Sequence, residues 1–134
     1  MASWDDVRRL ALALPETSEK PMHGMVSWRV RDKLFVWERP LRDKEVEELG
    51  EAAPEGPILG ARVEDLSAKE ALLADEPELY FTTSHFEGSP SVLVQLERIG
   101  EGDLAEIIAE AWLARAPKRL AKEYLERHGL AGAE

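Results

Sequence analysis

Hydrophobic residues recur along the chain at two spacings, and each spacing predicts one type of element. A spacing of three and four residues, typical of the buried face of a helix, occurs near both ends of the chain. The residues concerned are Trp4, Val7, Leu10, Ala11 and Leu14 near the start, and Leu104, Ile107, Ile108, Ala111 and Trp112 near the end. The first of these helices begins with a capping-box pattern at Ser3 and Asp6 and stops at Pro15.

Alternation of apolar and polar residues predicts strands in the middle of the chain. Two strands are expected over residues 25–31 and 33–39, joined by a hairpin turn, and the stretch 34–37 is apolar enough to lie inside the sheet. Further strands are expected over 58–63, 79–83 and 91–97, and helices over 41–49 and 65–75. A last helix opens at Pro117 and stops at Gly129, and residues 131–134 are expected to form a frayed tail.

The order of these elements predicts the fold class. Strands follow one another in hairpin-like pairs, which favours a mainly antiparallel sheet, and helices bracket the strands at both ends of the chain. No repeat, linker or low-complexity tract divides the sequence, and 134 residues suit one domain. We therefore expect a single α+β domain over residues 1–134, with helices covering one face of the sheet.

The composition is that of a globular protein, with 44% hydrophobic and 33% charged residues. The chain has no cysteine, which excludes disulfides, thiol catalysis and cysteine metal sites and fits a reducing cytosol. No apolar run approaches the roughly 20 residues that a membrane-spanning helix needs. The first residues have a charged amphipathic pattern instead of a signal peptide. These observations predict a cytoplasmic protein with no membrane partner.

The formal net charge of −10 counts against nucleic-acid binding, but the charge is unevenly distributed. Residues 20–44 hold seven basic and three acidic side chains, a net +4, and residues 115–134 hold five basic and three acidic ones, a net +2. Residues 45–81 hold two basic and eleven acidic side chains, a net −9. Such segregation is compatible with a dipolar surface, and also with ordinary charges that interleave once the chain folds.

Three motifs carry a resemblance to a known family. They are SWDDVRRLALALP at residues 3–15, SHFEGSPSVLVQL at 84–96 and APKRL at 116–120. With these motifs the chain resembles the MmcQ/YjbR family of small bacterial α+β proteins, and the resemblance covers most of its length. The resemblance implies a CyaY-like fold, akin to that of bacterial frataxin, and a binding module whose partner is DNA.

Phosphate contacts with DNA would come from two basic elements. The candidates are Arg29, Arg31 and Lys33 in the first hairpin, and Lys118, Arg119 and Lys122 in the first turns of the last helix. Trp28 and Trp37 interleave with the hairpin cations, as in surfaces that bind nucleic acid, but any amphipathic hairpin has the same pattern. The competing interpretation is that these cations pair with some of the 27 acidic side chains.

His85 suggests an alternative function. It lies between two predicted strands, in the order His, aromatic, acidic, Gly that the family motif has, so a ligand role is one interpretation. The other is structural: the histidine fixes a tight turn in which Gly88 takes a positive φ. If His85 lay beside Lys118 and Arg119 at the start of the last helix, the three would form a site for a small anion or a protein partner.

Enzyme chemistry finds little support in the sequence. There is no G-x-S-x-G elbow and no phosphate-binding loop, and adjacent residues such as Ser84 and His85 would point to opposite sides of a strand. The three histidines are far apart in sequence and form no metal-ligand spacing. Divalent metal binding on the acidic 45–81 segment, by analogy with frataxin, is a weaker interpretation. We therefore expect a non-enzymatic binding module without cofactor or metal.

Overall fold

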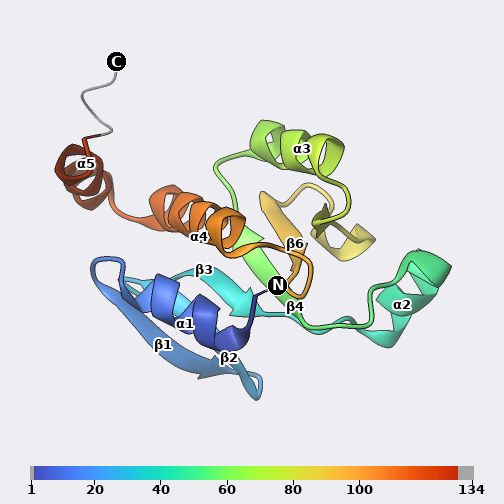
Figure 1. Ribbon diagram of the computed structural model, residues 1–134. Coiled ribbons are helices and arrows are strands. Elements are labelled where there is room, and N and C mark those ends of the chain that lie inside the picture. Colours follow the sequence, from blue (N-terminus) through green and yellow to red (C-terminus); the bar gives the residue numbers. More distant parts are fainter. Residues whose placement is uncertain (1, 130–134) are drawn as a thin grey trace.

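The computed structural model describes residues 2–129, which build one six-stranded sheet and the helices packed around it (Figure 1). The strands are β1 (Thr17–Met22), β2 (Met25–Val30), β3 (Lys33–Glu38), β4 (Ile58–Arg62), β5 (Tyr80–Phe81) and β6 (Ser91–Gln95). The helices are α1 (Trp4–Leu12), α2 (Asp43–Leu49), α3 (Leu66–Asp75), α4 (Glu101–Arg115) and α5 (Lys118–Arg127), with short 3-10 turns η1 (Gly50–Ala52) and η2 (Ser84–Phe86). Neighbouring strands are antiparallel in the order β1-β2-β3-β4-β6-β5, so the predicted α+β class is confirmed.

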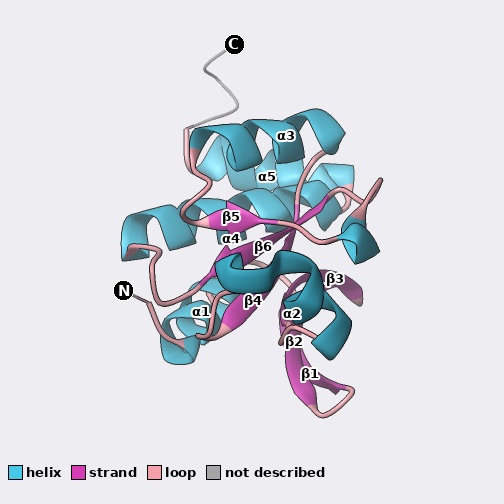
Figure 2. Cartoon of the chain, turned by 90° about the vertical axis from the view of Figure 1, so that its right-hand side faces the viewer, coloured by secondary structure: helices cyan, strands magenta, loops and turns pink. Residues whose placement is uncertain are grey.

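Helices α1 and α4 pack against each other on one face of the sheet (Figures 1 and 2). The predicted apolar stripe of α4 is fully buried there, and Trp112 is 0% exposed. Helix α4 lies chiefly over β3 and β4, the central strands, and Val92, Val94 and Leu96 belong to the same core.

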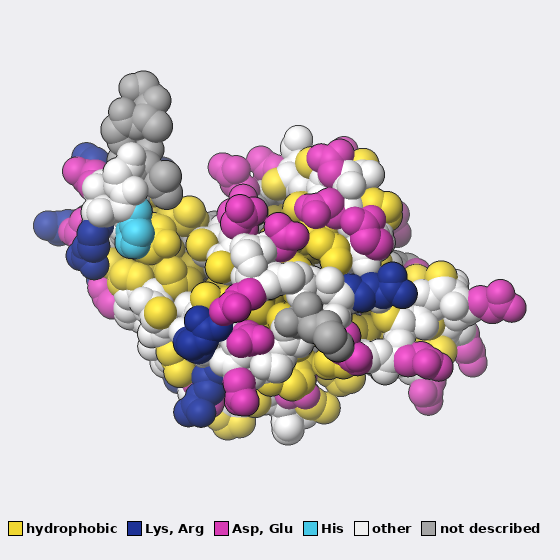
Figure 3. Space-filling view, in the orientation of Figure 1, with side chains coloured by type: hydrophobic (Ala, Val, Ile, Leu, Met, Phe, Trp, Pro, Cys, Tyr) yellow, Lys and Arg dark blue, Asp and Glu magenta, His cyan; other side chains and the backbone are white. Residues whose placement is uncertain are grey.

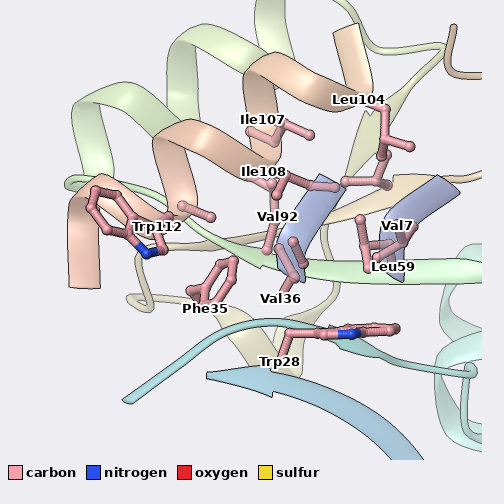
Figure 4. Packing of buried hydrophobic residues seen from close by; sticks show 14 of the residues in the cluster. Val7, Trp28, Phe35, Val36, Leu59, Val92, Leu104, Ile107, Ile108 and Trp112 are labelled. Carbon is pink, nitrogen blue, oxygen red and sulfur yellow. The ribbon is translucent and has the colours of Figure 1, made fainter. Parts of the chain in front are cut away.

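An irregularity in β3 brings two consecutive side chains onto this helix-covered face. Trp28 pairs with Val36 and Arg29 pairs with Leu34, so Phe35 is an extra residue in the ladder, a β-bulge. Phe35 and Val36 are both 0% exposed and belong to the same core, and Figure 4 shows both pointing toward α4. The bulge explains why the sequence of this strand is apolar without alternation.

A smaller apolar cluster occupies the opposite face of the sheet. It consists of Trp37, Ile58, Phe86 and Leu93. Trp37 lies across Gly60, its cross-strand partner, and a Cβ at Gly60 would come within 2.4 Å of the indole ring. Glycine is therefore required here for close packing of the ring against the strand.

Several local predictions are confirmed. Ser3 and Asp6 form the capping box of α1, and Gly88 has a φ of 77°. The β2–β3 turn lacks glycine, as the sequence shows, and instead places Arg31 and Asp32 at φ values of 46° and 69°. The helices predicted over 41–49 and 65–75 are present, and the strand over 58–63 is present as β4.

Two strands differ from the prediction. β1 was not predicted; it is an edge strand that contains Pro21, pairs with β2 and is joined to the end of α1 by hydrogen bonds from Thr17 to the carbonyl oxygens of Ala11 and Leu14. The strand predicted over 79–83 is reduced to two residues, because the chain turns into η2 from Ser84. The tail predicted over 131–134 lies outside the described residues. Among residues 2–129, no helix is long and apolar enough to cross a membrane.

Candidate functional site

Two basic segments that are far apart in the sequence meet at one end of the molecule. Arg115, the last residue of α4, donates from Nε to the carbonyl oxygen of Leu34 at 3.1 Å, which joins the start of β3 to the start of α5. Arg31, at the β2–β3 turn, donates hydrogen bonds to Glu16. Pro15, the residue before Glu16, lines a cavity of about 410 Å³ together with Tyr124 of α5, so α5 lies close to this turn. Figure 1 shows the β2–β3 turn and α5 at the same side of the view.

We call this region the basic end. It comprises Arg29, Arg31, Lys33, Arg62, Arg115, Lys118, Arg119 and Lys122. All six cations predicted from the sequence belong to it, and Arg62 and Arg115 are additional. Figure 3 shows basic side chains on α5 at this end, whereas acidic side chains gather over α3 and α2. The charge segregation seen along the sequence is kept only in part, because Arg39, Arg42 and Lys44 of the basic 20–44 segment lie at α2, among acidic side chains.

Some cations of the basic end are already paired. Arg31 makes a two-pronged ion pair with Glu16, with nitrogen–oxygen distances of 2.5 and 3.1 Å. The hydrogen bond from Arg31 lowers the pKa of Glu16, and the same bond raises the pKa of Arg31, with the charge of Glu123 as a smaller contribution. Arg119 lies 3.7 Å from Glu123 but is 93% exposed, so that pair is weak.

The remaining predicted cations make no ion pair with any residue in the described range. Lys33, Lys118 and Lys122 are exposed. Arg29 is half-buried on the face opposite α4, where it makes long contacts of 3.4 Å with Ser27, with the carbonyl oxygen of Asp32 and with the sulfur of Met22. These four side chains have hydrogen-bonding capacity to spare for an anion.

Arg62 is a member of the basic end that the sequence prediction missed. It ends β4, and its Nε atom is buried without a hydrogen-bond partner. Burial, followed by the positive charge of nearby Arg115, lowers the pKa of the Arg62 guanidinium.

Comparison with known proteins identifies the family. A family model described as YjbR matches residues 12–114. The chain belongs to the YjbR family. Relatives called uncharacterized protein Rv2570 of Mycobacterium tuberculosis and Mb2600 of Mycobacterium bovis are each 51% identical over 132 residues, which cover 96% of this chain and all of theirs. The crystal structure of Deinococcus radiodurans protein DR2400, with a domain named DUF419, has the same fold at a TM-score of 0.64 and 18% identity, covering 97% of this chain and 90% of that one.

The SHFEGSP segment, which carried the resemblance to the YjbR family, forms η2 and the loop into β6. Lys69 of α3 is buried and donates to the carbonyl oxygens of Phe86 and Ser89 at 2.7 and 2.9 Å. Glu48 of α2 accepts from the amide and hydroxyl of Ser84 at 2.9 and 2.7 Å. The turn is therefore fixed by α2 and α3, two elements that the sequence motif itself does not contain.

His85 is exposed on this turn and forms no hydrogen bond with a residue in the range 2–129 that the structure describes. Its ring meets the edge of Phe86 with a centroid distance of 4.9 Å. The hypothesis of a site shared with Lys118 and Arg119 is not realised, because α3 separates the two: Lys69 and Leu73 line one hollow with η2, while Ala68 and Leu72 line another with α5. Figure 1 places η2 and α5 on opposite sides of α3.

The acidic surface lies on the other elements. Burial, then the charges of neighbouring carboxylates, raises the pKa values of Glu76 and Glu110 on the α3–α4 side. Within residues 2–129, no three histidine or carboxylate side chains are grouped as metal ligands would be. The acidic 45–81 segment is thus a source of negative potential spread over α2, α3 and their connections.

Proposed function

We propose that this YjbR-family protein is a non-enzymatic, cytoplasmic module that binds the phosphate backbone of DNA through its basic end. The observation that carries the proposal is the meeting of the two basic segments, 29–33 and 115–122, although some 80 residues separate them in the chain. Phosphate contacts need several cations on one surface, and each neutralised phosphate releases a counterion.

The expected contacts come from the cations without a carboxylate partner. Lys33, Lys118 and Lys122 are exposed, and their long side chains can reach successive phosphates. The half-buried Arg29 offers a planar guanidinium group that can bind two phosphate oxygens at once. Arg31 is engaged by Glu16 and contributes mainly by positioning the β2–β3 turn. Such contacts carry no base recognition, so the proposed binding is independent of DNA sequence.

The net charge of −10 sets the strength and orientation of the proposed complex. Acidic side chains on α2 and α3 repel a duplex, so DNA would approach only from the basic end. With about three or four phosphates neutralised, log Kd should change with log salt concentration at a slope of roughly 3. Weak, salt-sensitive binding follows, with a Kd on the order of 10–100 µM at physiological salt.

A matched pair of double variants tests this proposal. Lys33→Glu with Lys118→Glu removes one cation from each segment, and Lys44→Glu with Arg98→Glu makes the same change in net charge at exposed, unpaired positions outside the basic end. Fluorescence anisotropy of a labelled duplex at low salt should show affinity lowered about ten-fold or more for the first variant, and a salt slope smaller by about two. The second variant should bind nearly as the parent does.

Equal losses in the two variants would mean that net charge alone governs the interaction and that the basic end is not the binding surface. Absence of binding by the folded parent protein at tens of micromolar, roughly the non-specific scale, would remove DNA as the partner.

A further inference from the structure

We propose that the cavity between α3, α4 and α5 binds a small organic cation, a molecule with an apolar body and one amino or amidino group. This activity is separate from the proposed binding of DNA and does not rest on it. Figure 2 shows the three helices together at the top of the view. The cavity between them has a volume of about 520 Å³, which lies within the range of roughly 300–1,000 Å³ that is typical of sites for small molecules.

Each of the three helices contributes apolar side chains to the walls of this cavity. They are Ala68 and Leu72 on α3, Leu113 and Ala114 on α4, and Ala121 and Leu125 on α5. All six are only half-buried, although three helices surround them, because the alanine side chains are too short to close the space. The walls therefore offer apolar surface that a bound molecule can remove from water.

Two carboxylates stand at the rim of these apolar walls. Glu110 precedes Leu113 and Ala114 by one turn of α4, so it lies on the same side of that helix, and Glu64 lines the cavity from the connection between β4 and α3. Neither carboxylate forms an ion pair within residues 2–129, and no lysine or arginine of that range lines the cavity. Partial burial, followed by the charges of Glu106 and Glu64, raises the pKa of Glu110, as expected for a carboxylate that has no cation beside it.

The chemistry of the ligand follows from this combination of apolar walls and unpaired carboxylates. An ammonium or amidinium group at the rim donates hydrogen bonds to Glu64 and Glu110 and offsets their repulsion, while the apolar body covers the alanine and leucine side chains. An anion with the same body is repelled by both carboxylates, and a neutral molecule gains only the contacts with the walls. The cavity therefore selects cations over neutral or anionic molecules of the same shape.

Three probes that share one apolar body test the site by methyl NMR of the parent protein. They are cyclohexylmethylamine, which is a cation at neutral pH, cyclohexylmethanol, which is neutral, and cyclohexanecarboxylate, which is an anion. The methyl signals of Leu72, Leu113 and Leu125 should shift together as the amine is added, with one Kd on the order of 1 mM. The alcohol should bind about five-fold more weakly or worse, and the carboxylate should leave these signals in place. The methyl signals of Val46, an exposed apolar residue on α2, should not move with any probe.

Matched variants separate the role of the charge from that of the cavity. Glu110→Gln should weaken binding of the amine about five-fold and leave binding of the alcohol unchanged. Glu47→Gln makes the same change in net charge at an exposed position of α2 and should affect neither probe. Ala114→Leu fills the cavity and should abolish binding of both, and its Tm shows whether the fold is kept.

Four outcomes would overturn the proposal. Equal binding of the three probes would mean that the carboxylates play no part, and so would an equal loss of affinity in Glu110→Gln and Glu47→Gln. Absence of any shift at roughly ten times the expected Kd of the amine would exclude the cavity as a binding site for such cations. Methyl signals of Leu72 and Leu125 that change with protein concentration alone would show that a second copy of the chain occupies the cavity instead.

Discussion

Replacement of Trp112 by alanine should lower the free energy of unfolding by about 3–5 kcal/mol, the range for large aromatic residues in a core. The indole lies on the buried face of α4 and is 0% exposed. It packs beside Tyr124 at a centroid distance of 5.0 Å and donates from Nε1 to the carbonyl oxygen of Pro15 at 3.0 Å. It therefore holds together α4, α5 and the end of α1, the elements that frame the basic end. In a domain of this size the loss corresponds to a Tm lower by roughly 10–20 °C.

Chemical denaturation of two companion variants makes the Trp112 test specific. Trp112→Phe keeps most of the packing but leaves the carbonyl of Pro15 without its donor, so a loss of about 1–3 kcal/mol is expected. Val46→Ala removes an apolar side chain that is 45% exposed on α2 and should cost about 0.5 kcal/mol or less. A Trp112→Ala protein no less stable than Val46→Ala would contradict the described core.

The buried ion pair between Arg39 and Glu45 should give the second large effect. Both side chains are less than a tenth exposed, with two contacts of 2.9 Å, and Thr83 adds a hydrogen bond to Glu45 at 2.7 Å. Glu45→Gln leaves the charge of Arg39 buried without its partner, which typically costs about 3–5 kcal/mol. Urea denaturation at pH 7 measures the loss.

The same pair predicts how stability depends on pH. Burial alone would raise the pKa of Glu45, but hydrogen bonds from Arg39, from the Arg42 amide and from Thr83 outweigh it and lower the pKa to about 2, from an ordinary 4.5. Because the folded-state pKa is depressed, the stabilisation is complete above about pH 4.5 and is lost as the pH falls toward 2. The loss is on the order of 3 kcal/mol.

Glu45→Gln should lack this component of acid sensitivity, so the difference in stability between parent and variant should shrink between pH 5 and pH 2. A difference that stays constant over that interval would show that Glu45 is not held as an ionised partner of Arg39.

Elements with a strong local pattern were predictable from the sequence. The α4 stripe ending at Trp112 and the capping box at Ser3 specify their helices through spacing alone. Strand β1 has no such pattern, since none of its residues is fully buried; it depends on pairing with the backbone of β2 and on the hydrogen bonds of Thr17 to the end of α1. The shortness of β5 also has a distant cause: Glu48 of α2 binds the amide of Ser84 and draws the chain into η2.

The candidate site was predictable only in part, because contacts between distant parts of the chain bring its residues together. Arg29, Lys33 and Lys118 were identifiable as basic positions, but their convergence depends on the contact between the end of α4 and the start of β3. Arg62 gave no signal in the sequence beyond an arginine at the end of an apolar strand, because its neighbour Arg115 is 53 residues away. The motif around His85 suggested a ligand role, yet Lys69 and Glu48, which lie outside the motif, stabilise the turn that contains it.

The most direct test of the central claim is a map of backbone amide shifts in the parent protein as a short duplex is added at low salt. Binding through the basic end predicts that amides of residues 29–33 and 115–122 shift together, with one common Kd, and that the shifts vanish as salt is raised. Amides of α2 and of η2, including His85, should stay in place. Shifts confined to residues 84–88, or spread evenly over the acidic surface of α2 and α3, would contradict the account.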